Sequence, residues 1–233
     1  MTFGSTFGRT FSPSFQPKSQ AKKGGGWWDL NGTITSCVAA YQPKGAASYA
    51  ASKVNLANPG TYNAVDGTAY PTWDTSTGWK GNGASQYLST GLPYNFKSAI
   101  VRFSGIGSNQ MLFGAGRPDR QALGYGIGRR YIGGHYTGCS TAGVNSLWMS
   151  KETITSGIIG MVASPRESYV NGYYSNTWDD VGTCTGNIHI LARENGSGVI
   201  DYYCSAYIAA LAIYDSYLTS QNILDLTTAM AAL

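Results

Sequence analysis

Residues 169–174 read YVNGYY, and this short stretch decides the fold. Asn171 and Gly172 are residue types that readily adopt a positive φ angle, which both central positions of a type I′ hairpin turn require. Tyr and Val, which favour strands, stand on both sides of the pair. We therefore predict that two antiparallel strands meet at Asn171-Gly172.

Short strand-like segments continue on both sides of this hairpin and are separated by Gly, Asn, Asp and Pro. This pattern is typical of an antiparallel all-β domain. The predicted strands are 87–89, 99–103, 111–114, 123–128, 131–136, 146–149, 158–163, 167–170, 188–192 and 207–214. His189 alternates with Ile188 and Ile190, so we expect its side chain to point outward from its strand.

The clearest helical pattern lies at the C-terminal end of the chain. Thr219 can cap a helix there, and four apolar residues follow at helical spacing: Ile223, Leu226, Met230 and Leu233. The Ala-rich segment 46–56 is a second candidate helix, which Asn58-Pro59-Gly60 ends. The chain therefore predicts an all-β sandwich with one short closing helix.

The charge of the 233-residue chain is unevenly placed. Residues 1–26 hold four basic residues and no acid, whereas 27–233 hold 12 basic and 12 acidic residues. The body is therefore neutral and offers no basic nucleic-acid-binding face by bulk charge, so we expect no nucleic-acid partner. We divide the chain into an N-terminal docking arm with a Gly linker, 1–26, and one folded domain, 27–233.

The arm contains a four-residue repeat. Residues 2–17 divide into TFGS, TFGR, TFSP and SFQP, and each tetrad begins with a hydroxyl residue followed by Phe. In an extended chain every fourth side chain points the same way, about 13 Å from the next, which places four residues in one apolar row: Phe3, Phe7, Phe11 and Phe15. We predict that this row, with Arg9 beside it, docks on a partner or a neighbouring subunit. The alternative is a disordered tail.

Three motifs resemble those of concanavalin A-like, laminin-G-type domains. They are 79–88 (WKGNGASQYL), 168–172 (SYVNG) and 207–215 (YIAALAIYD), the last followed by Leu218-Thr219 and the predicted helix. The resemblance covers roughly 27–233 and implies a concanavalin A-like antiparallel β-sandwich (jelly roll). This fold hosts lectins, glycosidases and adhesion modules, so the resemblance alone assigns no function.

A second resemblance accounts for the arm. The arm, the Trp27-Trp28 pair and residues 37–48 (CVAAYQPKGAAS) look like small structural proteins of tailed bacteriophages. The chain lacks the roughly 18 apolar residues of a membrane helix and the apolar core of about 7–15 residues of a secretory signal. We therefore expect a protein that is made in the host cytoplasm without a signal peptide, contacts no membrane and ends on the virion surface.

The acidic residues argue against an enzyme. Retaining glycosidases on this fold use two carboxylates about 5–5.5 Å apart, and none of Glu152, Glu167 and Glu194 has an acidic partner two or four residues away. Asp179 and Asp180 are adjacent and are a candidate calcium pair; the alternative is a solvated loop. We expect no enzyme and no cofactor, with calcium as the one candidate.

Aromatic and amide side chains are the candidates for glycan binding. Sugar rings have apolar faces and polar rims, which such side chains match. One set follows the Asn-Gly hairpin on an expected loop, 173–178, and consists of Tyr173, Tyr174, Asn176 and Trp178. The other set, Tyr131 and Tyr136, lies earlier in the chain. The alternative is that these tyrosines only cover sheet faces.

The four cysteines allow three pairings, among which the sequence cannot choose. Cys37 lies in an apolar run and is interpreted as a buried free thiol. We favour Cys184 paired with Cys204 or with Cys139.

These observations lead to one expectation and its rivals. The protein is expected to be a non-enzymatic virion surface protein, a capsid decoration or tail-associated protein, whose arm docks on a capsid or tail protein or on symmetry mates of a homo-oligomer. Its sandwich then faces outward toward host-surface glycans. The alternatives are a free carbohydrate-binding module or lectin and, third, a glycosidase.

Overall fold

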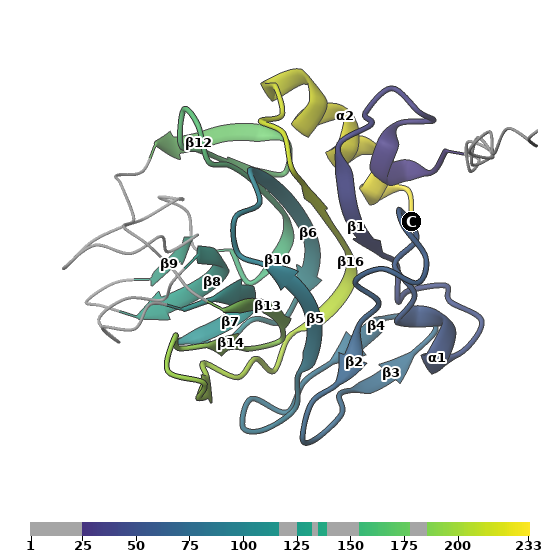
Figure 1. Cartoon of the computed structure of the whole chain (residues 1–233). Coiled ribbons are helices and arrows are strands. Elements are labelled where there is room, and N and C mark those ends of the chain that lie inside the picture. The colour runs from purple at the N-terminus through teal and green to yellow at the C-terminus, as the bar shows by residue number, and fades with distance from the viewer. Residues whose placement is uncertain (1–24, 117–124, 132–134, 139–153, 178–185) are drawn as a thin grey trace, which may run out of the picture.

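The computed structural model describes residues 25–116, 125–131, 135–138, 154–177 and 186–233. Two antiparallel β-sheets pack face to face there, and one helix lies on the outer face of the larger sheet (Figure 1). The predicted all-β sandwich with a C-terminal helix is confirmed.

The larger sheet has eight strands in the described residues, in the order β12-β11-β10-β6-β16-β4-β3, with β1 also paired to β16. They are β1 (Cys37–Tyr41), β3 (Thr72–Asp74), β4 (Gly78–Lys80), β6 (Ser98–Ser104), β10 (Ser156–Val162), β11 (Glu167–Val170), β12 (Tyr173–Thr177) and β16 (Tyr207–Tyr214). Beta-branched and aromatic residues in β6 and β16 suit these central positions.

The smaller sheet has six strands in the same part of the chain, in the order β2-β5-β13-β7-β8-β9. They are β2 (Val65–Asp66), β5 (Leu88–Pro93), β7 (Gln110–Ala115), β8 (Tyr125–Tyr131), β9 (His135–Gly138) and β13 (Asn187–Ile190). A separate pair is formed by β14 (Arg193–Glu194) and β15 (Ile200–Asp201).

The main core lies between the two sheets. Alternate residues of β6 and β16 point into it, as period-two side-chain alternation requires, and they meet Phe113 and Ile127 of the smaller sheet. Trp79 is fully buried in this core, and its indole N–H donates to the hydroxyl of Ser52 at 2.8 Å. The indole therefore buries a large apolar surface without leaving its one donor unsatisfied.

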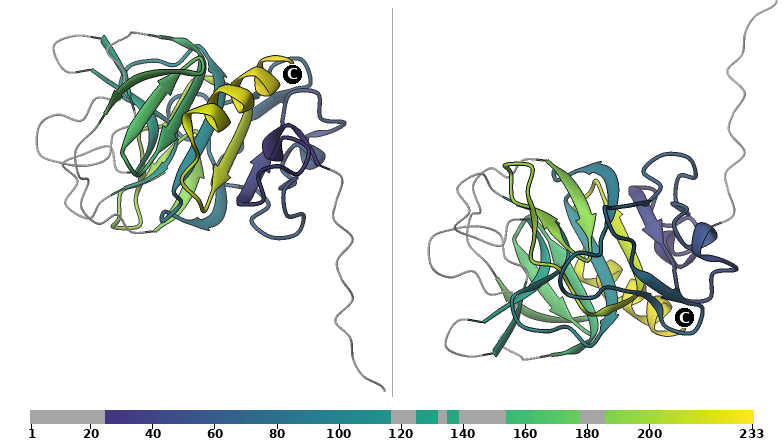
Figure 2. Two further views of the ribbon diagram at one scale, coloured as in Figure 1. Left: turned by 90° about the horizontal axis from the view of Figure 1, so that it is seen from above. Right: turned by 90° about the horizontal axis from the view of Figure 1, so that it is seen from below.

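A second core lies on the other face of the larger sheet, beneath helix α2 (Ser220–Ala231) (Figure 2). Ile223, Leu226 and Met230 are buried against it, as their spacing predicts. The hydroxyl of Thr219 accepts the backbone N–H of Asn222 at 3.1 Å, so the predicted N-cap is confirmed. The short helix η1 (Trp27–Asp29) packs beside α2. In the described part of the chain no helix is long and apolar enough to cross a membrane.

The Asn-Gly hairpin forms as predicted. Asn171 and Gly172 have φ angles of 51° and 87°, and Val170 pairs with Tyr173. The Asn171 side chain also accepts the backbone N–H of Ile158 at 3.0 Å, which fixes the turn to β10.

Several sequence expectations differ from the structure. The segment 46–56 contains only one helical turn, α1 (Tyr49–Ser52). Asn55 ends it, because its buried amide bonds to the backbone of Ala40 and Val38 in β1. Residues 131–136 are not one strand, since Tyr131 ends β8 and pairs with His135 in β9. Residues 146–149 lie outside the described residues.

Two further expectations are wrong in detail. Tyr173–Thr177 is an edge strand rather than a loop, because the tight turn leads directly into pairing with β11. His189 does lie on the opposite face from Ile188 and Ile190, but it is buried, with 7% of its surface exposed. Tyr87 covers it, with the two ring centroids 5.4 Å apart.

Cys204 is a free thiol, so its predicted pairing with Cys184 does not form. Burial raises the pKa of its thiol to about 12 and keeps it protonated and unreactive. Cys37 is also free, as predicted, and burial raises its pKa as well. Cys139 and Cys184 lie outside the described residues.

Candidate functional site

The candidate site lies beside a β-bulge in β16. Ile208 pairs with Phe103 and Ala210 with Arg102, so Ala209 is an extra residue without a partner on β6. Such a bulge redirects the backbone and leaves its polar groups available. On its other edge β16 pairs first with β4 and then with β1, and Ala209 lies between these two pairings.

The bulge holds the segment that follows β1. The backbone N–H of Lys44 donates to the carbonyl of Ala209 at 3.3 Å, and the N–H of Gly45 donates to the carbonyl of Thr75 at 2.7 Å. Lys44 is thereby fixed beside the turn between β3 and β4, which carries Ser76 and Thr77.

Gly78 allows this turn to lie close to β16. Its φ angle is +95°, and a β-carbon there would lie 2.1 Å from the carbonyl oxygen of Ile208. Because only glycine avoids both the strain and the collision, residue 78 sets how near the turn approaches the bulge.

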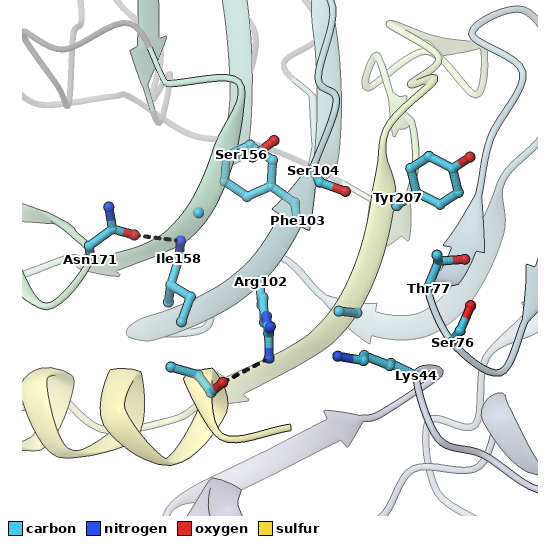
Figure 3. Close-up of a pocket in the computed structure, with 13 residues that line it drawn as sticks. Lys44, Ser76, Thr77, Arg102, Phe103, Ser104, Ser156, Ile158, Asn171 and Tyr207 are labelled. Carbon is cyan, nitrogen blue, oxygen red and sulfur yellow. Dashed lines mark hydrogen bonds between the residues drawn. The ribbon is translucent and has the colours of Figure 1, made fainter.

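Between these elements the outer face of the larger sheet holds a groove of about 440 Å³ (Figure 3). Its walls are residues of β6, β10 and β16, the β3–β4 turn, the segment after β1, the Asn-Gly turn and the end of α2. The lining residues are Lys44, Ser76, Thr77, Arg102, Phe103, Ser104, Ser156, Gly157, Ile158, Asn171, Tyr207, Ala209 and Ala231.

Arg102 connects the groove to the closing helix. One of its terminal nitrogens, Nη1, donates to the carbonyls of Met230 at 2.8 Å and Ala231 at 3.2 Å. A cation at a helix C-terminus satisfies carbonyls that have no partner within the helix and offsets their partial negative charge. The side chain is therefore held at the groove wall.

A second hollow of about 350 Å³ adjoins the groove and shares Ser76, Thr77 and Tyr207 with it. Its other lining residues are Thr72, Trp73, Asp74, Gly78 and Lys80. The Lys80 ammonium lies 4.8 Å from the centre of the Tyr207 ring and helps to orient it. Tyr207 therefore presents an aromatic surface where the two hollows join.

The predicted glycan residues of β12 lie beside this groove but do not line it. Tyr173 and Tyr174 are 73% and 57% exposed, and Tyr174 packs edge-on against Tyr169, with centroids 6.2 Å apart. Asn176 is half-buried, and its carbonyl accepts the hydroxyl of Ser168 at 3.0 Å. Asn171, from the turn before β12, is the part of this hairpin that reaches the groove.

The remaining predicted site residues lie on the smaller sheet or outside the described residues. Tyr131 ends β8 and Tyr136 lies in β9, on the smaller sheet. Outside the described residues lie Trp178, the candidate calcium residues Asp179 and Asp180, and the arm residues Phe3, Phe7, Arg9, Phe11 and Phe15. Within the described residues, no group of three or more His, Cys, Asp or Glu side chains is placed to hold a metal ion.

Sequence reasoning missed the groove because its walls come from segments that are far apart in the chain. One local signal was present: Arg102 is the only charged residue in the strand SAIVRFS. In the structure this side chain reaches the carbonyls of Met230 and Ala231 at the end of α2.

The fold was compared with known proteins. No protein-family model and no curated protein matches the chain. Among solved structures, a mutant of Trypanosoma rangeli sialidase displaying trans-sialidase activity matches with a TM-score of 0.53 and 15% identity, over 84% of this chain and 33% of that chain.

Trypanosoma rangeli sialidase in complex with 2,3-difluorosialic acid also gives a TM-score of 0.53 at 15% identity, over 82% of this chain and 32% of that chain. A mutant of HCR/D matches with a TM-score of 0.47 and 10% identity, over 83% of this chain and 52% of that chain. The chain spans about one third of the length of the sialidases that it matches.

The sialidase matches support the β-sandwich fold and correct one expectation. The prediction that the protein is not an enzyme is contradicted, because three solved structures that share its fold over most of its length are sialidases, which are enzymes. At 15% identity the likeness shows the fold alone and gives this chain no particular activity. The bacteriophage resemblance stays a prediction.

Proposed function

We propose that this protein binds saccharides, and that the groove on the outer face of the larger sheet is the binding site. The observation that carries the proposal is the composition of the groove. It joins two aromatic rings, of Tyr207 and the largely buried Phe103, to four serine or threonine hydroxyls and an amide in a single hollow of about 440 Å³.

This composition matches the chemistry of a sugar. The Tyr207 ring can pack against the apolar face of a pyranose, while Ser76, Thr77 and Ser104 can exchange hydrogen bonds with its hydroxyl groups. The adjoining hollow, with Trp73 and Asp74, provides room for a second sugar unit. The Trp73 indole N–H is already bonded to the carbonyl of Pro43 at 2.8 Å, so its ring orientation is set before a ligand arrives.

A glycan array probed with the full-length protein tests this function. We expect wild-type protein to bind a defined set of oligosaccharides and Tyr207→Ala to lose at least about tenfold in affinity, because the ring contact is removed. The matched control is Tyr217→Ala, which removes an exposed tyrosine that lies against Lys97 instead of in the groove.

Three results would contradict the proposal in different ways. If wild-type protein binds no saccharide, the function is wrong. If Tyr207→Ala binds as wild type does, the groove is the wrong site. If Tyr173→Ala and Tyr174→Ala abolish binding while Tyr207→Ala does not, the sugar lies on β12, as the sequence first indicated.

The proposal extends to the place where the protein acts. The Phe repeat of 2–17 and the basic charge of 1–26 support an arm that anchors a phage virion surface protein, capsid-decorating or tail-associated, with the sandwich directed toward host glycans. Co-expression with the capsid and tail proteins of the same genome tests this role. Replacing the four arm phenylalanines by Ser should abolish incorporation into particles, whereas replacement by Leu should preserve it; equal incorporation of both variants would overturn the anchoring role.

A further inference from the structure

We propose that the groove selects acidic saccharides, with a carboxylate or sulfate group of the sugar held between Lys44 and Arg102. This inference rests on the saccharide-binding function proposed above and names the ligand class.

The first argument is the charge of the lining. Lys44 and Arg102 are its two charged residues, and no carboxylate side chain is among the thirteen residues that line the groove. The body of the protein holds equal numbers of basic and acidic residues. The positive charge of the groove is therefore a local feature and does not follow from a basic composition.

The second argument is the state of Lys44. Three other lysines of the described residues each have a partner: Lys53 pairs with Asp66 at 2.8 Å, Lys80 lies over Tyr207, and Lys97 lies over Tyr217. Lys44 has no such partner within the described residues. It is half-buried and its backbone is fixed to Ala209, so its ammonium group is held near the groove without a counter-charge.

The third argument is the remaining capacity of Arg102. Its bonds to the helix carbonyls use Nη1, and Nε and Nη2 make no hydrogen bond to the described residues. Figure 3 shows the Lys44 ammonium directed toward the side of the groove on which Arg102 lies. A guanidinium matches the planar geometry of a carboxylate or the oxygens of a sulfate, and an ammonium adds a point charge. An anionic group between the two also relieves their mutual repulsion.

The fourth argument distinguishes a sugar acid from a small free anion. The hollow continues past the two cations to Ser76, Thr77 and Tyr207 and into the adjoining hollow. The aromatic ring at that end offers no hydrogen bond or charge to an isolated anion, whereas the ring and the hydroxyl groups together match the rest of a sugar unit.

The test is an array of matched pairs: sialylated, uronic acid and sulfated oligosaccharides beside their desialylated, carboxyl-reduced and desulfated forms. We expect the acidic member of at least one pair to bind about tenfold more tightly than its neutral form, since hydrogen bonds to charged groups are the stronger ones. Lys44→Gln should remove most of this preference, measured as the ratio of the affinities for the acidic and the neutral form of one pair. The control Lys97→Gln, which removes an equal charge outside the groove, should keep the preference.

The outcomes separate the two proposals. Equal binding of acidic and neutral forms overturns the acidic-ligand inference and leaves the saccharide-binding function standing. A preference that Lys44→Gln and Lys97→Gln reduce equally overturns the assignment to this groove, since it then reports the overall charge. If no saccharide binds, both proposals are overturned. The same holds if inorganic sulfate binds but no saccharide does.

Discussion

At the scale of single residues, His189 shows what strand alternation can and cannot predict. The alternation with Ile188 and Ile190 correctly places it on the opposite face of β13. It does not reveal that Tyr87 covers that face. Burial lowers the pKa of His189, although the carbonyl of Asn187 and the charge of Glu194 act in the opposite direction.

This lowered pKa predicts a dependence of stability on pH. The native state favours the neutral imidazole, whereas the unfolded chain takes up a proton near pH 6.5. The contribution of His189 to stability is therefore fully present above about pH 6.5 and is lost as the pH falls toward the folded pKa.

Thermal melts of wild type and His189→Asn from about pH 7.5 to about pH 5.5 check the prediction. Wild type should lose more stability over this range than the variant, whose amide can keep the bond to the Asn187 carbonyl that His189 makes at 3.0 Å. The other titratable groups are the same in both proteins and cancel in the difference. Parallel melting curves would contradict the burial effect.

At the scale of elements, α2 is the part that the sequence predicted best. Backbone groups at both of its ends have side-chain hydrogen-bond partners: the Thr219 hydroxyl at the N-terminus and the Arg102 guanidinium at the C-terminus. The cap was readable because it is local, whereas the Arg102 contact joins residues 128 positions apart.

The N-cap can be tested by removing the Thr219 hydroxyl. Thr219→Ala should lower the free energy of unfolding by about 1 kcal/mol, which corresponds to about 2–4 °C in melting temperature for a domain of this size. Thr228→Ala is the matched control, because its hydroxyl is exposed and bonds only to the carbonyl of Leu224; it should change stability by less than about 0.5 kcal/mol. Equal effects of the two changes would show that Thr219 does not act as a cap.

At the scale of the whole molecule, the two cores lie on the two faces of one sheet. The buried residues that form them come from 34–230. The larger sheet is thus covered by the smaller sheet on one face and by α2 on the other (Figures 1 and 2). The groove lies where α2 ends, since Arg102 and Ala231 both line it.

Deletion of residues 2–17 should therefore leave the stability of the body unchanged, within about 0.5 kcal/mol. Urea unfolding of the deletion variant beside the full chain measures this. A loss of several kcal/mol would show that the arm packs on its own body and would contradict the division of the chain at residue 26.

The sequence by itself determined the fold class, the Asn171-Gly172 hairpin and the capped C-terminal helix, because turns, caps and side-chain periodicity depend on neighbouring residues. Only the tertiary structure decided the groove, the covering of His189 and the free thiol of Cys204. These depend on which segments pack together: the groove needs the bulge at Ala209, the close approach at Gly78 and the end of α2 at Arg102. Packing between distant segments leaves no periodic signal in a chain, so the proposed binding groove could be identified only from the fold.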